Sequence, residues 1–93
     1  MSIRKELRAF AELMEERLQA KDMDRGTKGW AQRHPLWLLA RAEQELKELK
    51  DSLVQGADAS CVVQEAADVA NFVMFIADVV AGGPASLLDE VEE

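Results

Sequence analysis

The chain has 93 residues, of which 48% are hydrophobic, and a formal net charge of −7. This length predicts a single domain over residues 1–93, which buries only about 60–65% of the surface that its unfolded chain exposes. The acidic balance argues against binding to nucleic-acid polymers, because their phosphate backbone attracts basic surfaces. One cysteine excludes an intrachain disulfide, and without a signal-peptide pattern we expect a cytoplasmic protein.

Apolar residues at helical spacing predict a first amphipathic helix over residues 2–21, with Ser2 as its N-cap. Its apolar face would consist of Ile3, Leu7, Phe10, Met14 and Leu18. Residues 22–34 interrupt this period with two glycines, a tryptophan and several basic side chains. This second stretch therefore predicts a loop.

A second helix is predicted over residues 35–55, because Pro35 suits a first helical turn and Gly56 suits a helix end. Its apolar seam would consist of Leu39, Ala42, Leu46, Leu49 and Leu53. This seam predicts the face that packs against the rest of the protein.

The third predicted helix covers residues 58–81, with Asp58 or Ser60 as its N-cap. It is apolar on almost every side, which is typical of a helix that is buried all round. Two other helices of one chain can hardly cover it, so we expect an all-α bundle completed by a second copy, as a homodimer or a tetramer. No membrane span is expected, because each of its carboxylates would cost about 2.5–3.5 kcal/mol near a bilayer centre.

Two pairs of carboxylates lie in the second and third predicted helices. Glu45 and Glu48 form one pair, and Glu65 and Asp68 form the other. Each pair has i, i+3 spacing, which places both of its members on one helix face. An antiparallel hairpin with its turn at residues 55–58 would bring the two pairs together, although a solvated surface is the alternative for each pair.

Four carboxylates that converge in an apolar groove would repel one another strongly. They are tolerable if they are protonated, if they pair with arginine or lysine, or if they hold a divalent cation. Oxygen ligands without a Cys/His cluster favour Mg²⁺, or Mn²⁺ in its place, over zinc. Mg²⁺ usually keeps positions open for substrate phosphates, so the pairs also suggest a phosphate-bearing substrate.

The stretch "EQELKEL" (residues 43–49), followed by "EAADVANF" (residues 65–72), resembles the motif of the MazG-like all-α nucleoside triphosphate pyrophosphohydrolases. That motif has two Glu residues at i, i+3, a spacer, and E-x-x-D. The matching positions are Glu45, Glu48, Glu65 and Asp68. The order and spacing of the stretches between about residues 10 and 80 are similar to a phage and bacterial subgroup described as dATP/dGTP pyrophosphohydrolase-like.

The resemblance implies hydrolysis of a (deoxy)nucleoside triphosphate to the monophosphate and pyrophosphate, in nucleotide-pool cleansing or phage nucleotide metabolism. It implies that the four carboxylates bind Mg²⁺ and that Glu45 or Glu48 accepts the proton of the attacking water. It also implies an obligate dimer, often paired into a tetramer, whose subunits share the site. The alternative is a non-catalytic nucleotide-binding or helical dimerisation module, which the short acidic stretch after Pro84 favours.

Residues outside the carboxylate pairs are candidates for contacts with the nucleotide. In the family an aromatic residue near the position of Trp30 stacks on the base; a plug for the end of the bundle is the alternative. Lys28, Arg33 and Arg41 could supply positive charge to the phosphates, or could lie on the surface.

Two residues of the third predicted helix could complete the substrate pocket. Asn71 could hydrogen-bond the sugar or a neighbouring carboxylate, and Phe72 could form a wall of the sugar pocket or belong to the core. Trp37 is predicted to be core or interface, with a contact to the ligand as the alternative. His34 could cap the second helix or touch the nucleotide, and Asp78 is expected at a solvated end or in an interface pair.

Overall fold

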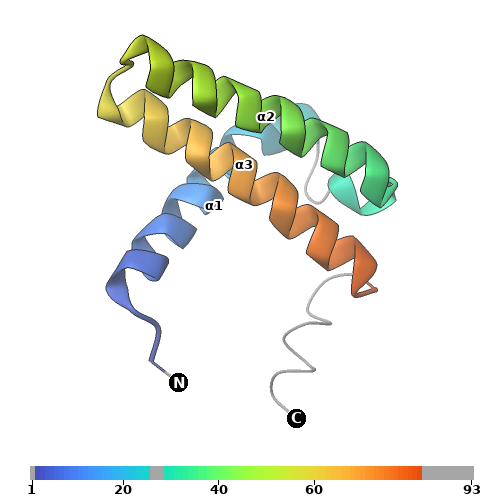
Figure 1. Ribbon diagram of the computed structural model, residues 1–93. Helices are drawn as coiled ribbons and strands as arrows, with labels where there is room; N and C mark the ends of the chain where they lie inside the picture. The colour runs from blue at the N-terminus through green and yellow to red at the C-terminus, as the bar shows by residue number, and fades with distance from the viewer. Residues whose placement is uncertain (1, 26–28, 83–93) are drawn as a thin grey trace.

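The computed structural model describes residues 2–25 and 29–82, and in these ranges the chain is helical with no strand. Helix α1 spans Lys5–Arg25, α2 spans Pro35–Gln55 and α3 spans Ala59–Val80, with a short 3-10 helix, η1, at Gly29–Gln32 (Figure 1). The all-α prediction is therefore confirmed. Lys28 and the acidic stretch after Pro84 lie outside the described residues.

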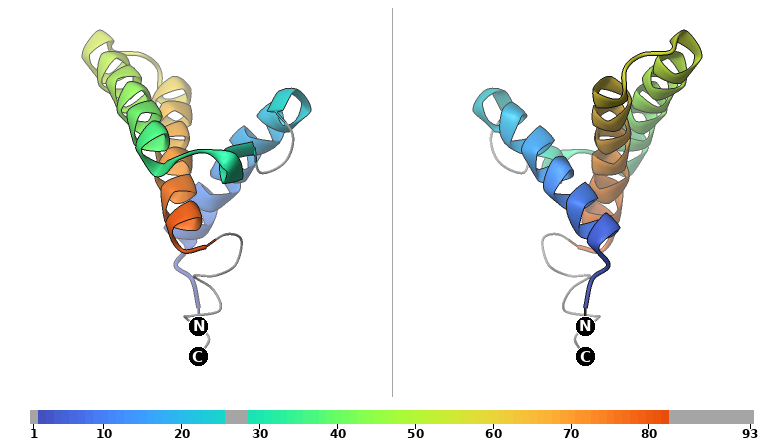
Figure 2. Two further views of the ribbon diagram at one scale, coloured as in Figure 1. Left: turned by 90° about the vertical axis from the view of Figure 1, so that its right-hand side faces the viewer. Right: turned by 90° about the vertical axis from the view of Figure 1, so that its left-hand side faces the viewer.

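Helix α3 is the central element of the described structure. It packs along α2 in an antiparallel hairpin and also contacts α1 and η1 (Figure 1). Figure 2 shows that α1 diverges from the hairpin, so that the two arms form an open V with η1 between them. The described residues of α1, η1, α2 and α3 line a common cavity, which contains the candidate site.

Local capping signals define the ends of α2 and α3. Nδ1 of His34 accepts a hydrogen bond from the backbone N–H of Leu36 at 3.0 Å, and Pro35 occupies the first turn. Gly56 ends α2 in the left-handed conformation, with φ of 70°, which glycine adopts without steric cost. Asp58 caps α3 by accepting from the backbone N–H of Cys61 at 2.9 Å. These observations confirm Gly56 as the stop, and they select His34 and Asp58 as the caps.

The predicted limits of the first helix were wrong at both ends. Helix α1 begins at Lys5 instead of near Ser2, and the carbonyl of Arg4 accepts from the backbone N–H of Arg8. At the other end α1 continues to Arg25, into the stretch that was predicted as a loop. The physical reason is that residues 22–25 contain no glycine or proline, and the first helix-breaking residue of the sequence is Gly26.

The buried face of α2 also differs from the predicted leucine seam. Leu38, Ala42 and Glu45 are buried, whereas Leu39, Leu46 and Leu53 of the predicted seam are exposed. The helix carries two adjacent apolar stripes, and packing against α3 covers only one of them. This choice of stripe is what turns Glu45 toward the interior.

The hydrophobic core is small and lies between α2 and α3. Its buried members are Leu38, Ala42, Ala67, Phe72 and Phe75. The expectation that α3 is buried on most sides is not met within one chain, because Val63, Val73 and Val80 are exposed. By length and composition alone α3 could cross a membrane, but core helices pass the same test. Here its Asp68, Asn71 and Phe72 are buried against the other helices.

Candidate functional site

A cluster of carboxylates lies between α2 and α3, where the sequence predicts one. Carboxylate oxygens of Glu45, Glu65 and Asp68 lie within 4.8 Å of one another. The turn at Gly56 produces this approach, because it folds α2 and α3 into an antiparallel hairpin. Glu48, the fourth predicted member, is exposed and lies outside this group of three.

Glu45 has the most perturbed environment of the three clustered carboxylates. Its side chain is almost fully buried, and this desolvation raises its pKa from 4.5 to about 7. The nearby carboxyl group of Glu48 raises the pKa further, as does the charge of Asp68, while Lys21 opposes them. Near neutral pH, Glu45 therefore holds a proton for part of the time, and that proton relieves the crowding of negative charge.

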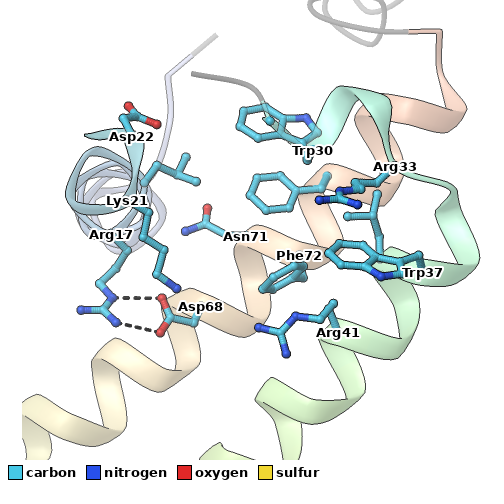
Figure 3. A pocket seen from close by; sticks show the side chains of 14 residues that line it. Arg17, Lys21, Asp22, Trp30, Arg33, Trp37, Arg41, Asp68, Asn71 and Phe72 are labelled. Carbon is cyan, nitrogen blue, oxygen red and sulfur yellow. Dashed lines mark hydrogen bonds and ion pairs between the residues drawn. The ribbon is translucent and has the colours of Figure 1, made fainter. Parts of the chain in front are cut away.

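Arg17 of α1 supplies the counter-charge for Asp68. Its Nε and one terminal nitrogen donate to the two carboxylate oxygens of Asp68, each at 2.9 Å (Figure 3). Another of its nitrogens donates to the side-chain oxygen of Gln64 at 3.3 Å. Such bidentate pairs are among the strongest charge-assisted hydrogen bonds in proteins. The sequence interpretation missed Arg17, and no local signal singles it out, because Glu15 and Glu16 beside it are charged as well.

A cavity of about 490 Å³ begins at Asp68 and extends between α1, η1, α2 and α3. Aromatic side chains form much of its wall: Trp30, Trp37, Phe72 and Phe75. Basic side chains surround it from two sides: Arg17 and Lys21 on α1, with Arg33 and Arg41 opposite (Figure 3). The volume is within the usual range for small-molecule sites, and apolar walls with a few convergent polar groups are typical of them.

Trp30 is held in the wall of this cavity by two contacts. Its ring stacks on Phe75, with the centroids 4.3 Å apart and the planes at 11°. Its Nε1 donates to a carboxylate oxygen of Asp78 at 3.0 Å. Asp78 is therefore an internal anchor for Trp30, and the expectation of a solvated end or an interface pair was wrong. Trp30 both packs against the core and lines the cavity, so neither of its two interpretations is excluded.

The basic residues on the α2 side pack on aromatic faces. The guanidinium of Arg41 lies 5.2 Å from the ring centroid of Phe72, and it also bonds Glu45 at 3.3 Å and the side chain of Gln44. The guanidinium of Arg33 lies 4.5 Å from the ring of Trp37. Trp37 is 45% exposed and lines the cavity, so within one chain it is not a core residue, and its predicted place in an interface stays a prediction.

Asn71 lies deep in the same cavity and is only 4% exposed. Its Nδ2 donates to the backbone carbonyl of Met14 on α1 at 3.1 Å. Its Oδ1 is buried and has no hydrogen-bond partner among the described residues. A neighbouring carboxylate was one of the two predicted partners of this amide. Among the described residues the amide bonds the backbone of Met14 and no carboxylate.

The structure brings most of the predicted site residues into one region. Trp30, Arg41, Asp68, Asn71 and Phe72 all line the cavity, with Glu45 and Glu65 clustered beside Asp68. The sequence interpretation placed four further lining residues outside the site, namely Arg17, Leu18, Lys21 and Asp22. They all belong to α1, whose position relative to α3 has no local signature in the sequence.

Comparison of the chain with known proteins gives no match. No protein-family model, no curated protein and no solved structure matches it. The similarity to MazG-like enzymes therefore stays a prediction that depends on the motif residues.

Proposed function

We propose that this chain is a Mg²⁺-dependent pyrophosphohydrolase of (deoxy)nucleoside triphosphates, which releases the monophosphate and pyrophosphate. The observation that carries the proposal is the continuity of two features: the three-carboxylate cluster meets, at Asp68, a cavity with aromatic and basic walls. A metal-bound triphosphate needs carboxylates, a base needs aromatic faces, and phosphates need cations. All three kinds of group are present at one place, and the motif resemblance points to the same reaction.

The donor set fits a hard divalent cation. Glu45, Glu65 and Asp68 offer only oxygen ligands, which suit Mg²⁺ or Mn²⁺. The raised pKa of Glu45 also fits, because burial and the neighbouring carboxylates disfavour its charged form, and a cation beside it would favour that form. When bound there, Mg²⁺ would neutralise phosphate charge and favour ionisation of water.

The side chains of the chain itself would perform the remaining tasks. Glu48 is exposed to water beside Glu45, and we assign to it the role of accepting a proton from the water that attacks the α-phosphorus. The bond from that phosphorus to the bridging oxygen breaks, and pyrophosphate leaves. Arg41 lies where it can stabilise negative charge on the phosphates, while Arg33 lines the end of the cavity near Trp30, whose ring offers a surface for the base.

A pyrophosphate-release assay tests this function directly. Purified protein with Mg²⁺ and a panel of nucleoside triphosphates should release pyrophosphate, and EDTA should abolish the release. Asp68→Asn and Glu65→Gln should reduce turnover at least 100-fold, with the helical circular-dichroism spectrum retained. Glu43→Gln, at an exposed carboxylate of α2, is the matched control and should keep full activity. Orthophosphate as the sole product, or full turnover in both site variants, would contradict the proposal.

A non-catalytic nucleotide-binding protein is the second candidate. The observation in its favour is the ion pair of Arg17, which already occupies both oxygens of Asp68. Arg41 pairs with Glu45, so that within the described residues Glu65 is the one clustered carboxylate without an ion pair. Calorimetric titration with nucleotides separates the two functions. Tight binding without any product supports this candidate, whereas turnover excludes it.

A homodimer, alone or paired into a tetramer, also belongs to the proposal. Large apolar side chains are exposed on the outer faces of the hairpin: Leu39, Leu46 and Leu53 on α2, and Val63 and Val73 on α3. Their burial by a second copy would remove the apolar surface that one chain leaves in water. Light scattering on the purified protein should give at least twice the 10.3 kDa of one chain, and Leu46→Asp should shift it toward the monomer.

A further inference from the structure

The orientation of the Asn71 amide is determined by its partner on α1. The carbonyl oxygen of Met14 can only accept a hydrogen bond, so the group that faces it at 3.1 Å must be the amide nitrogen. Oδ1 then points away from Met14 as a fixed, buried acceptor with no partner among the described residues. An unsatisfied buried acceptor is unfavourable, and a ligand that donates a hydrogen bond to it removes that penalty.

The position of Asn71 along α3 indicates which part of a nucleotide it would meet. Asp68, Asn71 and Phe75 follow one another at i, i+3 and i+7, so they lie on one face of α3. At 1.5 Å per residue, Asn71 lies about 4.5 Å beyond Asp68 along the helix axis, and Phe75 about 6 Å further. Figure 3 shows the same order, with Asn71 between Asp68 and Trp30.

This order matches the order of the parts of a nucleotide. The carboxylate cluster at Asp68 is the place for a cation and its phosphates, and the stacked Trp30 and Phe75 are the place for a planar base. The group between phosphate and base is the sugar. Among the polar groups of a deoxyribose, only the hydroxyl can donate a hydrogen bond, because the ring oxygen only accepts.

We infer that Asn71 is a specificity-determining residue whose Oδ1 accepts a hydrogen bond from a sugar hydroxyl, with the nucleotide lying along α3 and its base toward the C-terminal end of the helix. This inference rests on the proposed function for the identity of the ligand as a nucleotide. It adds the direction in which the nucleotide lies and the group that Asn71 recognises. It also requires that ligands without a sugar hydroxyl are disfavoured.

The test compares nucleotides that differ only in the sugar hydroxyl. The four 2′-deoxynucleoside triphosphates and their 2′,3′-dideoxy counterparts are assayed for pyrophosphate release with Mg²⁺, and for binding through the fluorescence of Trp30 and Trp37. For the best base, we expect wild-type protein to prefer the hydroxyl-bearing form by about tenfold in kcat/KM and in affinity, as for one hydrogen bond.

Two variants assign this preference to Asn71. Asn71→Leu has a similar volume but no acceptor, so the preference should fall to near one while the dideoxy form binds as it does to wild type. Arg33→Gln is the matched control, because it should weaken both forms equally and leave the preference near tenfold. Circular dichroism and thermal unfolding establish that each variant is folded.

Each outcome separates this inference from the proposed function. Equal rates for the two forms in wild type overturn the inference, even if no variant folds, and leave the pyrophosphohydrolase proposal intact. A preference that persists in Asn71→Leu overturns the assignment to Asn71. Preference in binding without pyrophosphate release supports the inference and contradicts the enzyme. Neither binding nor release with any nucleotide overturns both.

Discussion

Helix α3 has two contact faces of different chemistry. Against α2 it buries apolar groups, with Leu38 and Ala42 packed on Phe72 and Phe75. Against α1 its best-defined contacts are polar: the Arg17–Asp68 ion pair and the bond from Asn71 to Met14. Apolar burial is insensitive to pH and ions, whereas charged contacts depend on both. The apolar contacts of the hairpin are thus insensitive to protons and cations, whereas the attachment of α1 and the carboxylate cluster between α2 and α3 depend on both.

The largest expected effect is on the apolar face. Leu38 is fully buried, so Leu38→Ala should lower the free energy of unfolding by about 3 kcal/mol, as for large-to-small changes in a core. Chemical denaturation measures this loss. The neighbouring Leu39 is exposed, and Leu39→Ala should cost less than about 1 kcal/mol. A cost for Leu39 as large as that for Leu38 would show that another surface covers the second stripe of α2.

The next effect is on the polar face. Arg17→Met leaves Asp68 buried without its partner, and should cost about 2 kcal/mol in the presence of EDTA, since Arg17 itself is partly exposed. Millimolar Mg²⁺ should recover part of this loss, because a cation can replace the guanidinium beside Asp68. Urea denaturation with and without Mg²⁺ gives both values.

The exposed ion pair of α2 is the control for this change. Lys47 lies 3.5 Å from Asp51, and both side chains are largely in water. Lys47→Met should cost less than about 0.5 kcal/mol, with no dependence on Mg²⁺. A loss in Arg17→Met that Mg²⁺ leaves unchanged would count against a cation site at Asp68.

A smaller effect, of opposite sign, is expected for Glu45→Gln. The folded protein holds the proton on Glu45 more tightly than the unfolded chain, with a pKa of about 7 against 4.5. Its contribution to stability is therefore fully present below pH 4.5 and is lost as the pH rises through about 7. Glutamine keeps the neutral form at every pH, so the variant should melt a few degrees higher at pH 8 and almost unchanged at pH 5.

Charged groups around Glu45 contribute to this pH dependence, so these residues must stay unchanged in the variant. They are Glu48, Glu65, Asp68, Lys21 and Arg41. Glu43→Gln changes an exposed carboxylate of the same helix and should leave the pH profile of melting unaltered. Equal stabilisation by Glu45→Gln at pH 5 and pH 8 would contradict the raised pKa.

The smallest expected effect concerns Trp30, in the wall of the cavity. Asp78→Ala removes the acceptor for Nε1 of Trp30 and should cost about 0.5–1 kcal/mol, because Asp78 is only half-buried. The emission of Trp30 should shift as its ring loosens from Phe75. Asp51→Ala, remote from the tryptophans, should leave the emission unchanged. A spectrum identical to wild type in Asp78→Ala would show that stacking alone holds Trp30.

The comparison of the faces also shows where prediction from sequence succeeds. Gly56, Pro35 and Asp58 act on residues within a few positions of themselves, and the ends of α2 and α3 were predicted within one residue. The approach of Glu45, Glu65 and Asp68 was also predicted, because a short turn makes it a local consequence of two helices. The predicted end of the first helix was wrong, because the basic residues and glycines of the following stretch suggested a loop before Gly26.

By itself the sequence determined the helices, the hairpin and the approach of the two carboxylate pairs, since caps, turns and periodicity act over short distances along the chain. It did not determine that Glu48 lies outside the cluster. Only the tertiary structure decided which stripe of α2 is buried, and with it the burial of Glu45 beside Asp68. It also decided that Arg17 neutralises Asp68 from 51 positions away, and that Asp78 anchors Trp30 from 48. The physical reason is that periodicity assigns a residue to a face of its own helix, while the partner of that face depends on how α1 and η1 pack against α3.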